Sequence, residues 1–129
     1  MDGRSLIELA KEAREASYSP YSGFAVGAAL LAKSGKVYLG CNIENAAYSA
    51  TICAERVAFV KAVSGGEREF KAIAIVGGEE SADEICYPCG TCRQFMSEFC
   101  GGDFMLYFAD GDKTVGYTFD EILPHRFEL

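Results

Sequence analysis

Three cysteines and one glutamate stand in two short motifs that could perform hydrolytic chemistry. Cys53 and Glu55 form a Cys-x-Glu pair, and Cys89 and Cys92 belong to a later Pro-Cys-x-x-Cys motif. Three thiolates can hold a zinc ion and leave a fourth position for water, which distinguishes a catalytic from a structural zinc. A carboxylate beside such a site can move a proton from water to a ring nitrogen and then to a leaving amine. The pattern therefore favours hydrolytic deamination of an amidine-like carbon.

Two predicted helices must position these thiols. Residues 53–63 repeat small apolar side chains at helical spacing after Thr51, a candidate cap, and residues 90–100 form a second helix that two glycines end. We expect Cys53, Cys89 and Cys92 near the two helix N-termini, where unpaired N–H groups favour thiolate over thiol. Arg56 follows closely and is placed to offset part of the negative charge of the thiolates.

The motif spacing alone leaves a structural site open. Cys86 and Cys89 also form a Cys-x-x-Cys pair, so Cys53, Cys86, Cys89 and Cys92 could close around a zinc without a catalytic water. Such a chain would be a zinc-stabilised interaction module, and a chain without metal is a third alternative. Pro88 next to Cys89, and Glu55 with no other role, favour the catalytic interpretation.

The order of the predicted elements indicates an α/β fold. Ser5 and Glu8 suggest a capping box for a first helix, and strand-helix-strand units favour parallel pairing. We expect three α/β/α layers around one mixed five-stranded sheet. The predicted helices cover residues 4–17, 53–63, 90–100 and a short stretch opened by a capping box at Thr118, and the predicted strands cover 24–33, 36–42, 70–76, 104–109 and 114–117.

Length and charge limit the possible partners. The 129 residues are expected to form one domain, 1–129, and 19 acidic against 12 basic residues give a net charge of −7. Nucleic-acid binding relies on Lys and Arg clusters, so we expect no nucleic acid but a small-molecule or protein partner. No apolar run approaches the length of a membrane span, and six cysteines without a secretory signal suggest a cytoplasmic protein with metal-bound or free thiols.

Four ordered motifs together carry a resemblance that covers the chain from about Tyr21 to Phe127. These are Phe24-Ala-Val-Gly-Ala-Ala, Asn42-Ile-Glu-Asn-Ala, Cys53-Ala-Glu-Arg and Pro88-Cys-Gly-Thr-Cys-Arg-Gln. In this order and at these separations they resemble the short, tetrameric class of cytidine deaminases, whereas the zinc motif alone is typical of the whole zinc-deaminase superfamily. Cys41 departs from the pattern, since an aromatic residue often precedes the Asn-Ile-Glu-Asn segment.

The resemblance implies a reaction, a cofactor and an assembly. The chain would convert cytidine or deoxycytidine to uridine or deoxyuridine and ammonia in pyrimidine salvage, with one zinc per chain on Cys53, Cys89 and Cys92. Glu55 would be the proton shuttle. It also implies a homotetramer in which neighbouring subunits complete each active site. The implied substrate-binding residues are Asn42 and Glu44 for the ribose, Phe24 for the pyrimidine ring, the backbone of Ala54 for the base, and Tyr48 and Phe127 from neighbouring subunits.

Several of these residues also have ordinary structural interpretations. From spacing alone, Asn42 and Glu44 would be polar residues of a loop turn whose hydrogen bonds are made within the protein. Phe24 would be a core aromatic residue, and Phe127 would belong to a locally packed tail. The other cysteines, Cys41, Cys86 and Cys100, are expected to be buried small apolar groups. The same chemistry could act on single-stranded nucleic acid or a cytosine-bearing antibiotic; the acidic composition opposes the first and the Asn42–Glu44 pair opposes the second.

Overall fold

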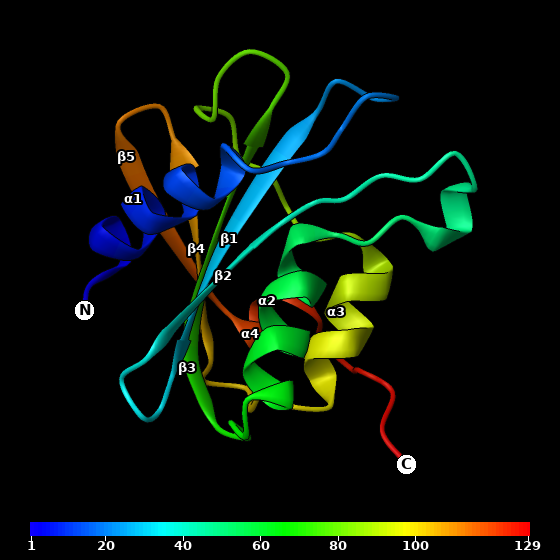
Figure 1. Cartoon of the computed structure of the whole chain (residues 1–129). Coiled ribbons are helices and arrows are strands. Elements are labelled where there is room, and N and C mark those ends of the chain that lie inside the picture. Colours follow the sequence, from blue (N-terminus) through cyan, green and yellow to red (C-terminus); the bar gives the residue numbers. More distant parts are fainter.

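A computed structural model describes residues 1–129 as one mixed sheet between two helical layers (Figure 1). The three-layer, five-stranded prediction is thereby confirmed. The strands lie in the order β2-β1-β3-β4-β5. The elements are α1 (Gly3–Arg14), β1 (Ala25–Ala32), β2 (Val37–Cys41), the 3₁₀ turn η1 (Tyr48–Ala50), α2 (Ala54–Ser64), β3 (Phe70–Gly78), α3 (Gly90–Ser97), β4 (Met105–Asp110), β5 (Lys113–Thr118) and α4 (Phe119–Ile122).

The sheet topology places α2 and α3 on the same face. β1 pairs antiparallel with β2 and β3, β3 pairs parallel with β4 through the α3 crossover, and β5 returns antiparallel to β4. In Figure 1, α2 and α3 lie side by side with their N-termini at the same end, while α1 covers the opposite face. The two helix starts that carry the cysteine motifs therefore meet.

Alternating strand residues supply both cores. On β3, Ile73 and Ile75 face α2, α3 and α4, whereas Ala74 and Val76 face α1. All four side chains are fully buried. An unbroken apolar run such as residues 72–76 predicts a strand that is covered on both faces, and the structure agrees. The larger core holds Phe59 of α2 among other aromatic rings.

Gly40 sets how closely α2 approaches the sheet. A β-carbon on Gly40 would collide with the Ala54 carbonyl oxygen and would lie only 2.6 Å from the Ala58 amide nitrogen. Because both contacts are to backbone, no side chain could move aside. The missing side chain lets the first turn of α2, with Cys53 and Glu55, rest directly on β2.

The helix boundaries differ from the sequence-based expectations. The N-cap of α1 is Asp2, whose side chain accepts a 2.8 Å hydrogen bond from the Ser5 amide, so the capping box proposed at Ser5 is wrong. The helix also ends at Arg14 rather than at residue 17. Thr51 does not cap α2, because it closes the preceding 3₁₀ turn and Cys53 takes the N-cap position. The capping box at Thr118 is confirmed.

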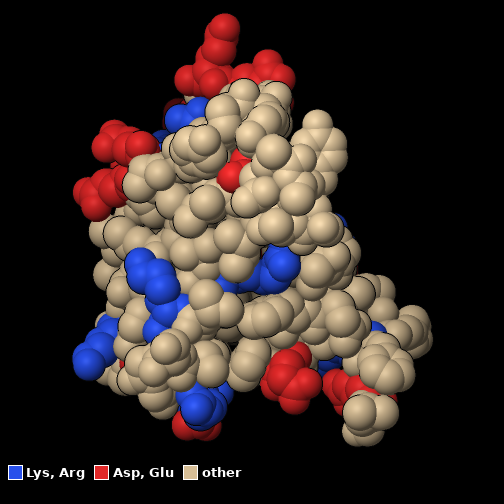
Figure 2. All heavy atoms as spheres, turned by 45° about the vertical axis from the view of Figure 1, so that its right-hand side comes forward, with Lys and Arg blue, Asp and Glu red and all other residues tan.

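The surface that carries α2 and α3 is largely uncharged. Figure 2 shows Lys and Arg in separate small groups on this face, while Asp and Glu gather at its upper end and lower edge. The upper group lies where the 79–84 loop projects, with Glu79, Glu80, Asp83 and Glu84 exposed. None of the helices combines the length and the apolar character needed to cross a membrane.

Candidate active site

The three predicted zinc ligands converge where α2 meets α3. Cys53 and Cys89 are the N-cap residues of these helices, and Cys92 lies in the first turn of α3. The Cys53 and Cys89 sulfurs are 3.8 Å apart, and all three sulfurs lie within 4.8 Å of one another. Neither N-cap sulfur is engaged in a capping hydrogen bond with the backbone of its helix.

The charges around the sulfurs favour a bound cation. The Arg56 guanidinium donates to Cys53 Sγ over 3.5 Å. A hydrogen bond from Cys92, then those from Arg56 and Cys89, lower the pKa of Cys53 to about 5 against the opposing effect of burial. The same Cys53 thiolate, together with burial, strongly raises the pKa of Cys92. Three thiolates cannot share this space without a compensating positive charge, so the donor set fits a zinc ion.

Cys86 stands outside this cluster. The group of sulfurs close enough to share one metal contains Cys53, Cys89 and Cys92 only. Cys86 instead packs beside Gly77, where an added β-carbon would lie 2.8 Å from its sulfur. Burial raises the pKa of the Cys86 thiol to about 12, which keeps it neutral. The geometry therefore favours an open three-thiolate site over the closed four-thiolate alternative.

Glu55 lies buried beside the sulfurs. It is 5% exposed, in the first turn of α2, two residues after the first ligand. Burial raises its pKa to about 7; its own backbone amide opposes the shift and the Cys53 thiolate adds to it. A buried carboxyl group at this position can exchange a proton with a substrate without contacting bulk water.

Phe24 lies immediately before β1 and close to Cys86. A β-carbon on Gly77 would approach Phe24 Cε1 to 2.9 Å as well as the Cys86 sulfur, so Phe24 and Cys86 meet over Gly77. The residue as a whole remains 36% exposed, so Phe24 is not the core aromatic that spacing alone suggests. Its position leaves one part of the ring free for a ligand. Ala54, by contrast, has a fully buried side chain and can offer a ligand only its backbone.

Asn42 is held almost completely by the protein itself. Its Oδ1 accepts from the Val26 amide over 2.9 Å and from the Ser17 hydroxyl, and its Nδ2 donates to the Phe24 carbonyl over 2.8 Å. The residue is 8% exposed. One amide hydrogen is left for a ligand, so Asn42 fixes the backbone of Phe24 and retains a single donor.

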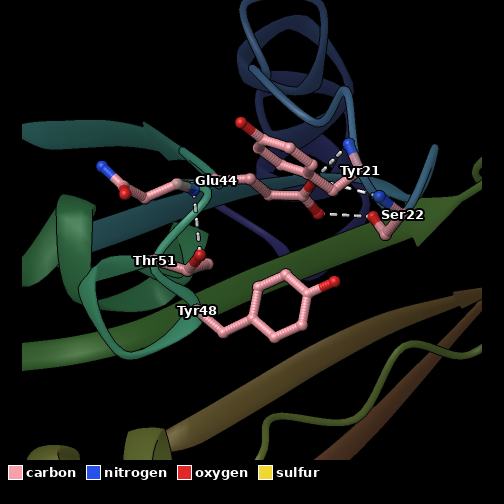
Figure 3. Close-up of a pocket in the computed structure, with 6 residues that line it drawn as sticks. Tyr21, Ser22, Glu44, Tyr48 and Thr51 are labelled. Carbon is pink, nitrogen blue, oxygen red and sulfur yellow. Dashed lines mark hydrogen bonds between the residues drawn. The ribbon is translucent and has the colours of Figure 1, made fainter.

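Glu44 lines a cavity of about 290 Å³ beyond the end of β2. Figure 3 shows its carboxylate turned toward the backbone and hydroxyl of the 21–22 turn, with the Tyr48 ring at the other side of the cavity. Oε1 accepts from the amides of Tyr21 and Ser22 over 3.0 and 3.1 Å, and Oε2 accepts from the Ser22 hydroxyl. The hydrogen bonds from Ser22 lower the pKa of Glu44, so the group is a carboxylate.

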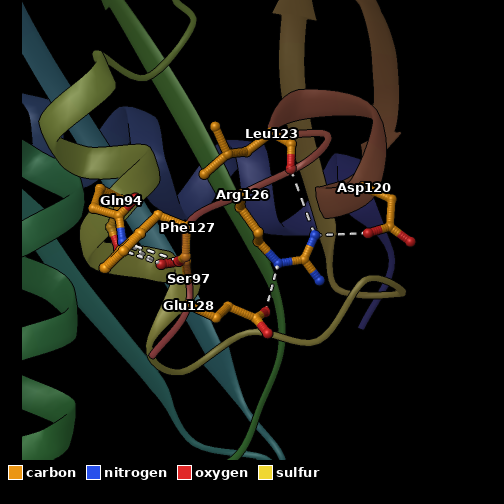
Figure 4. A network of polar contacts seen from close by, with 7 residues as sticks. All are labelled: Gln94, Ser97, Asp120, Leu123, Arg126, Phe127 and Glu128. Atoms are coloured by element: carbon orange, nitrogen blue, oxygen red, sulfur yellow. Dashed lines mark hydrogen bonds and ion pairs between the residues drawn. The ribbon is translucent and has the colours of Figure 1, made fainter.

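Tyr48 and Phe127 project away from their own chain. Their side chains are 79% and 66% exposed, and Phe127 lies in the tail after α4. Figure 4 shows the tail held by Arg126, which pairs with Asp120 over 2.7 Å and Glu128 over 3.4 Å. The tail is therefore anchored, not frayed, although neither aromatic ring joins the sulfur cluster of its own chain.

Some residues that shape the site were absent from the sequence-based prediction. Ser17 and Ser22 bind Asn42 and Glu44 across 25 and 22 positions. Arg93 joins the Pro88 carbonyl, next to a predicted ligand, to the Ile122 carbonyl of α4 over 2.8 and 2.6 Å. No local motif encodes such long-range contacts, so only the fold reveals them.

The remaining cysteines are only partly as expected. Cys100 is 7% exposed and lies in the larger core. Cys41 and Cys86 are half-buried, so the expected burial is only partial for both. Cys41 occupies the last position of the edge strand β2, and Cys86 lies in the segment between β3 and α3.

Comparison with known proteins defines the class to which this fold and site belong. The profile of the cytidine and deoxycytidylate deaminase zinc-binding region matches residues 2–108. The cytidine deaminase of Sporosarcina psychrophila is 56% identical, covering 98% of this chain and 92% of that protein, and that of Halalkalibacterium halodurans is 47% identical over 98% and 95%. A crystal structure of cytidine deaminase from Burkholderia pseudomallei superposes with a TM-score of 0.89 at 42% identity, covering 98% of this chain and all of that one. The chain belongs to the cytidine deaminase family.

Arg56 offers a direct test of the charge argument. Arg56→Gln removes the guanidinium that bonds Cys53 Sγ, and a hydrogen bond to a charged group is commonly worth about 2 kcal/mol. We expect a folded protein whose zinc affinity or turnover falls by roughly 30-fold. Zinc competition with a chromophoric chelator and steady-state rates measure both. Arg4→Gln, an exposed change on α1, is the control, and an Arg56→Gln protein equal to it in both respects would contradict the argument.

Proposed function

We propose that this chain catalyses the zinc-dependent hydrolytic deamination of cytidine and 2′-deoxycytidine to uridine and 2′-deoxyuridine, with release of ammonia. The proposal treats residues 1–129 as one catalytic domain. The observation that carries it is the burial of Glu55 beside three converging sulfurs at the start of two helices. The family relationship supports the choice of substrate.

The proposed chemistry divides between the metal and Glu55. Cys53, Cys89 and Cys92 would hold the zinc, which when bound supplies a Lewis acid that makes water a better nucleophile. Glu55 accepts a proton as water adds to C4 of the cytosine ring and returns it to N3. It then transfers a proton to the departing amino group, so that cytidine and water yield uridine and ammonia.

The other proposed roles concern binding. Phe24 would pack on the pyrimidine ring, since aromatic faces favour such contacts, and the backbone of Ala54 would contact the base. The remaining Nδ2 hydrogen of Asn42 and the carboxylate of Glu44 would bind sugar hydroxyls. Arg56 would balance the charge of the thiolates.

A substrate panel tests this function. Purified protein with measured zinc content is mixed with cytidine, 2′-deoxycytidine, single-stranded oligodeoxycytidine and a cytosine-bearing antibiotic, and the loss of cytosine absorbance is followed. We expect conversion of both nucleosides, with neither the oligonucleotide nor the antibiotic turned over at a comparable rate. Zinc-containing protein that converts neither nucleoside would refute the proposal.

We also propose that the active form is a homotetramer with shared active sites. Several large apolar side chains project from the face with α2 and α3 and the neighbouring loops, and apolar exposure of this kind marks protein contacts. They are Ile43, Tyr48, Val60 and Phe127. Tyr48 and Phe127 would then enter sites of neighbouring copies.

Mixed tetramers provide the test of site sharing. Phe127→Ala is expected to raise KM for cytidine by roughly tenfold, the effect of losing one well-packed aromatic contact. Co-expression of Phe127→Ala chains with inactive Glu55→Gln chains should restore sites of wild-type affinity, because an intact Glu55 can meet an intact Phe127 from its neighbour. Leu129→Ala, at the exposed terminus, is the control. A kinetic profile identical to that of the Phe127→Ala protein alone would contradict shared sites.

We further propose a role in pyrimidine salvage in the cytoplasm. All six cysteines are unpaired, and metal-binding thiols persist in a reducing compartment. Deamination there would return cytosine nucleosides to the uracil nucleotide supply.

A further inference from the structure

The Ser22 hydroxyl joins two residues that the proposed function assigns to different parts of the substrate. It donates to Oε2 of Glu44, the proposed sugar contact, and accepts a 2.9 Å hydrogen bond from the amide of Phe24, the proposed base contact. In Figure 3 the Ser22 hydroxyl points toward the Glu44 carboxylate at one side of the cavity. One hydroxyl thus uses its single proton and one lone pair to connect both residues.

The remaining contacts of Glu44 define what this hydroxyl adds. The amides of Tyr21 and Ser22 already occupy Oε1, so Oε1 stays bound without the hydroxyl. Oε2 receives only the Ser22 hydroxyl from the protein, and a carboxylate oxygen has about two acceptor positions. One position on Oε2 is therefore left for a ligand, and Ser22 determines which way it points.

We infer that Ser22 is a positioning residue for nucleoside binding: it orients the Glu44 carboxylate toward a sugar hydroxyl, while the Asn42 side chain still holds the Phe24 backbone when the hydroxyl is removed. This inference rests on the proposed function. The hydrogen bonds of the Ser22 side chain go to Glu44 and Phe24 and not to the sulfur ligands or Glu55, so Ser22 is expected to act on binding and not on the chemical step. A residue of this kind changes KM and leaves kcat nearly constant.

The turn itself does not depend on the hydroxyl. The Gly23 amide donates to the Ser19 carbonyl over 3.0 Å, and Gly23 adopts a φ of +70° that suits glycine. Ser22 is exposed, so its truncation to alanine leaves no buried cavity. The variant is thus expected to fold, which makes its kinetics interpretable.

The experiment compares Ser22→Ala with Ser22→Thr, which keeps a hydroxyl, on cytidine and on 2′,3′-dideoxycytidine. Hydrogen bonds to charged groups are commonly worth about tenfold or more in binding, so Ser22→Ala should raise KM for cytidine by roughly tenfold with kcat within about twofold. Ser22→Thr should restore most of the affinity. The dideoxy substrate lacks both secondary sugar hydroxyls, so its KM should change little in Ser22→Ala.

The chain contains a matched control in the β1–β2 turn. Ser34 donates to the Glu67 carboxylate over 2.6 Å and accepts from the Lys36 amide over 3.4 Å, the same arrangement at the opposite end of these strands. Ser34→Ala should leave both kinetic constants unchanged. An unchanged KM for cytidine in Ser22→Ala, or an equal rise for the dideoxy substrate, would overturn the inference. Failure of the wild-type protein to convert cytidine would refute the proposed function itself.

Discussion

Glutamine in place of Glu55 is expected to lower the turnover of cytidine by roughly 100- to 10,000-fold, the usual contribution of a general acid–base group. The side chain is 5% exposed in the first turn of α2, and glutamine has the same shape, so packing should persist. Its amide cannot accept a proton from water. Single-turnover rates, circular dichroism and zinc content on one preparation separate the loss of chemistry from the loss of fold or metal.

Glu67→Gln is the matched control for the Glu55→Gln variant. Glu67→Gln removes a charge at the far end of the sheet, where Glu67 bonds Ser34 and Tyr38, and should leave turnover unchanged. Glu55→Gln protein that retains zinc and the wild-type rate would exclude Glu55 as the proton shuttle.

Cys89→Ala is expected to abolish stable zinc binding and turnover together. Loss of a residue that only supports a metal ligand typically costs about 10- to 100-fold in affinity, so loss of a direct ligand should exceed this. Cys89 is an exposed N-cap residue, so alanine there should cost little folding stability apart from the metal. Metal analysis after dialysis against a weak chelator measures the loss.

Cys86→Ala is the matched cysteine control. Its sulfur lies outside the group formed by Cys53, Cys89 and Cys92, so we expect one zinc per chain and near wild-type turnover. A small loss of stability is expected, since Cys86 packs against the larger core. If Cys86→Ala lost zinc as Cys89→Ala does, the site would be a closed four-thiolate centre and the catalytic account would be wrong.

Local patterns sufficed for the architecture and the sulfur cluster. The apolar run of β3 predicted burial on both faces. The two cysteine motifs, each at a predicted helix start, indicated that the N-termini of α2 and α3 lie close together. These features depend on periodicity and turn chemistry, which neighbouring residues determine. The resemblance to a family supplied the binding roles, which spacing alone would have assigned to ordinary loop and core positions.

Other features depend on contacts between distant segments. Cys86 lies outside the sulfur cluster because it packs beside Gly77. Its Cys-x-x-Cys spacing with Cys89 could not reveal this packing. The capping box at Ser5 failed because Asp2, one turn earlier, supplies a better-placed acceptor. The link from Ser22 to Glu44 spans two different loops, so only the folded chain brings it together.

The most direct test of the central claim is a zinc titration of metal-free protein, with the rate of cytidine conversion measured at each point. Three converging sulfurs and one buried carboxylate predict no turnover without metal and a linear rise that ends at one zinc per chain. Glu55→Gln protein should bind the same amount of zinc without the rise in rate. Full turnover by metal-free protein, or one bound zinc per wild-type chain with no turnover, would contradict the account.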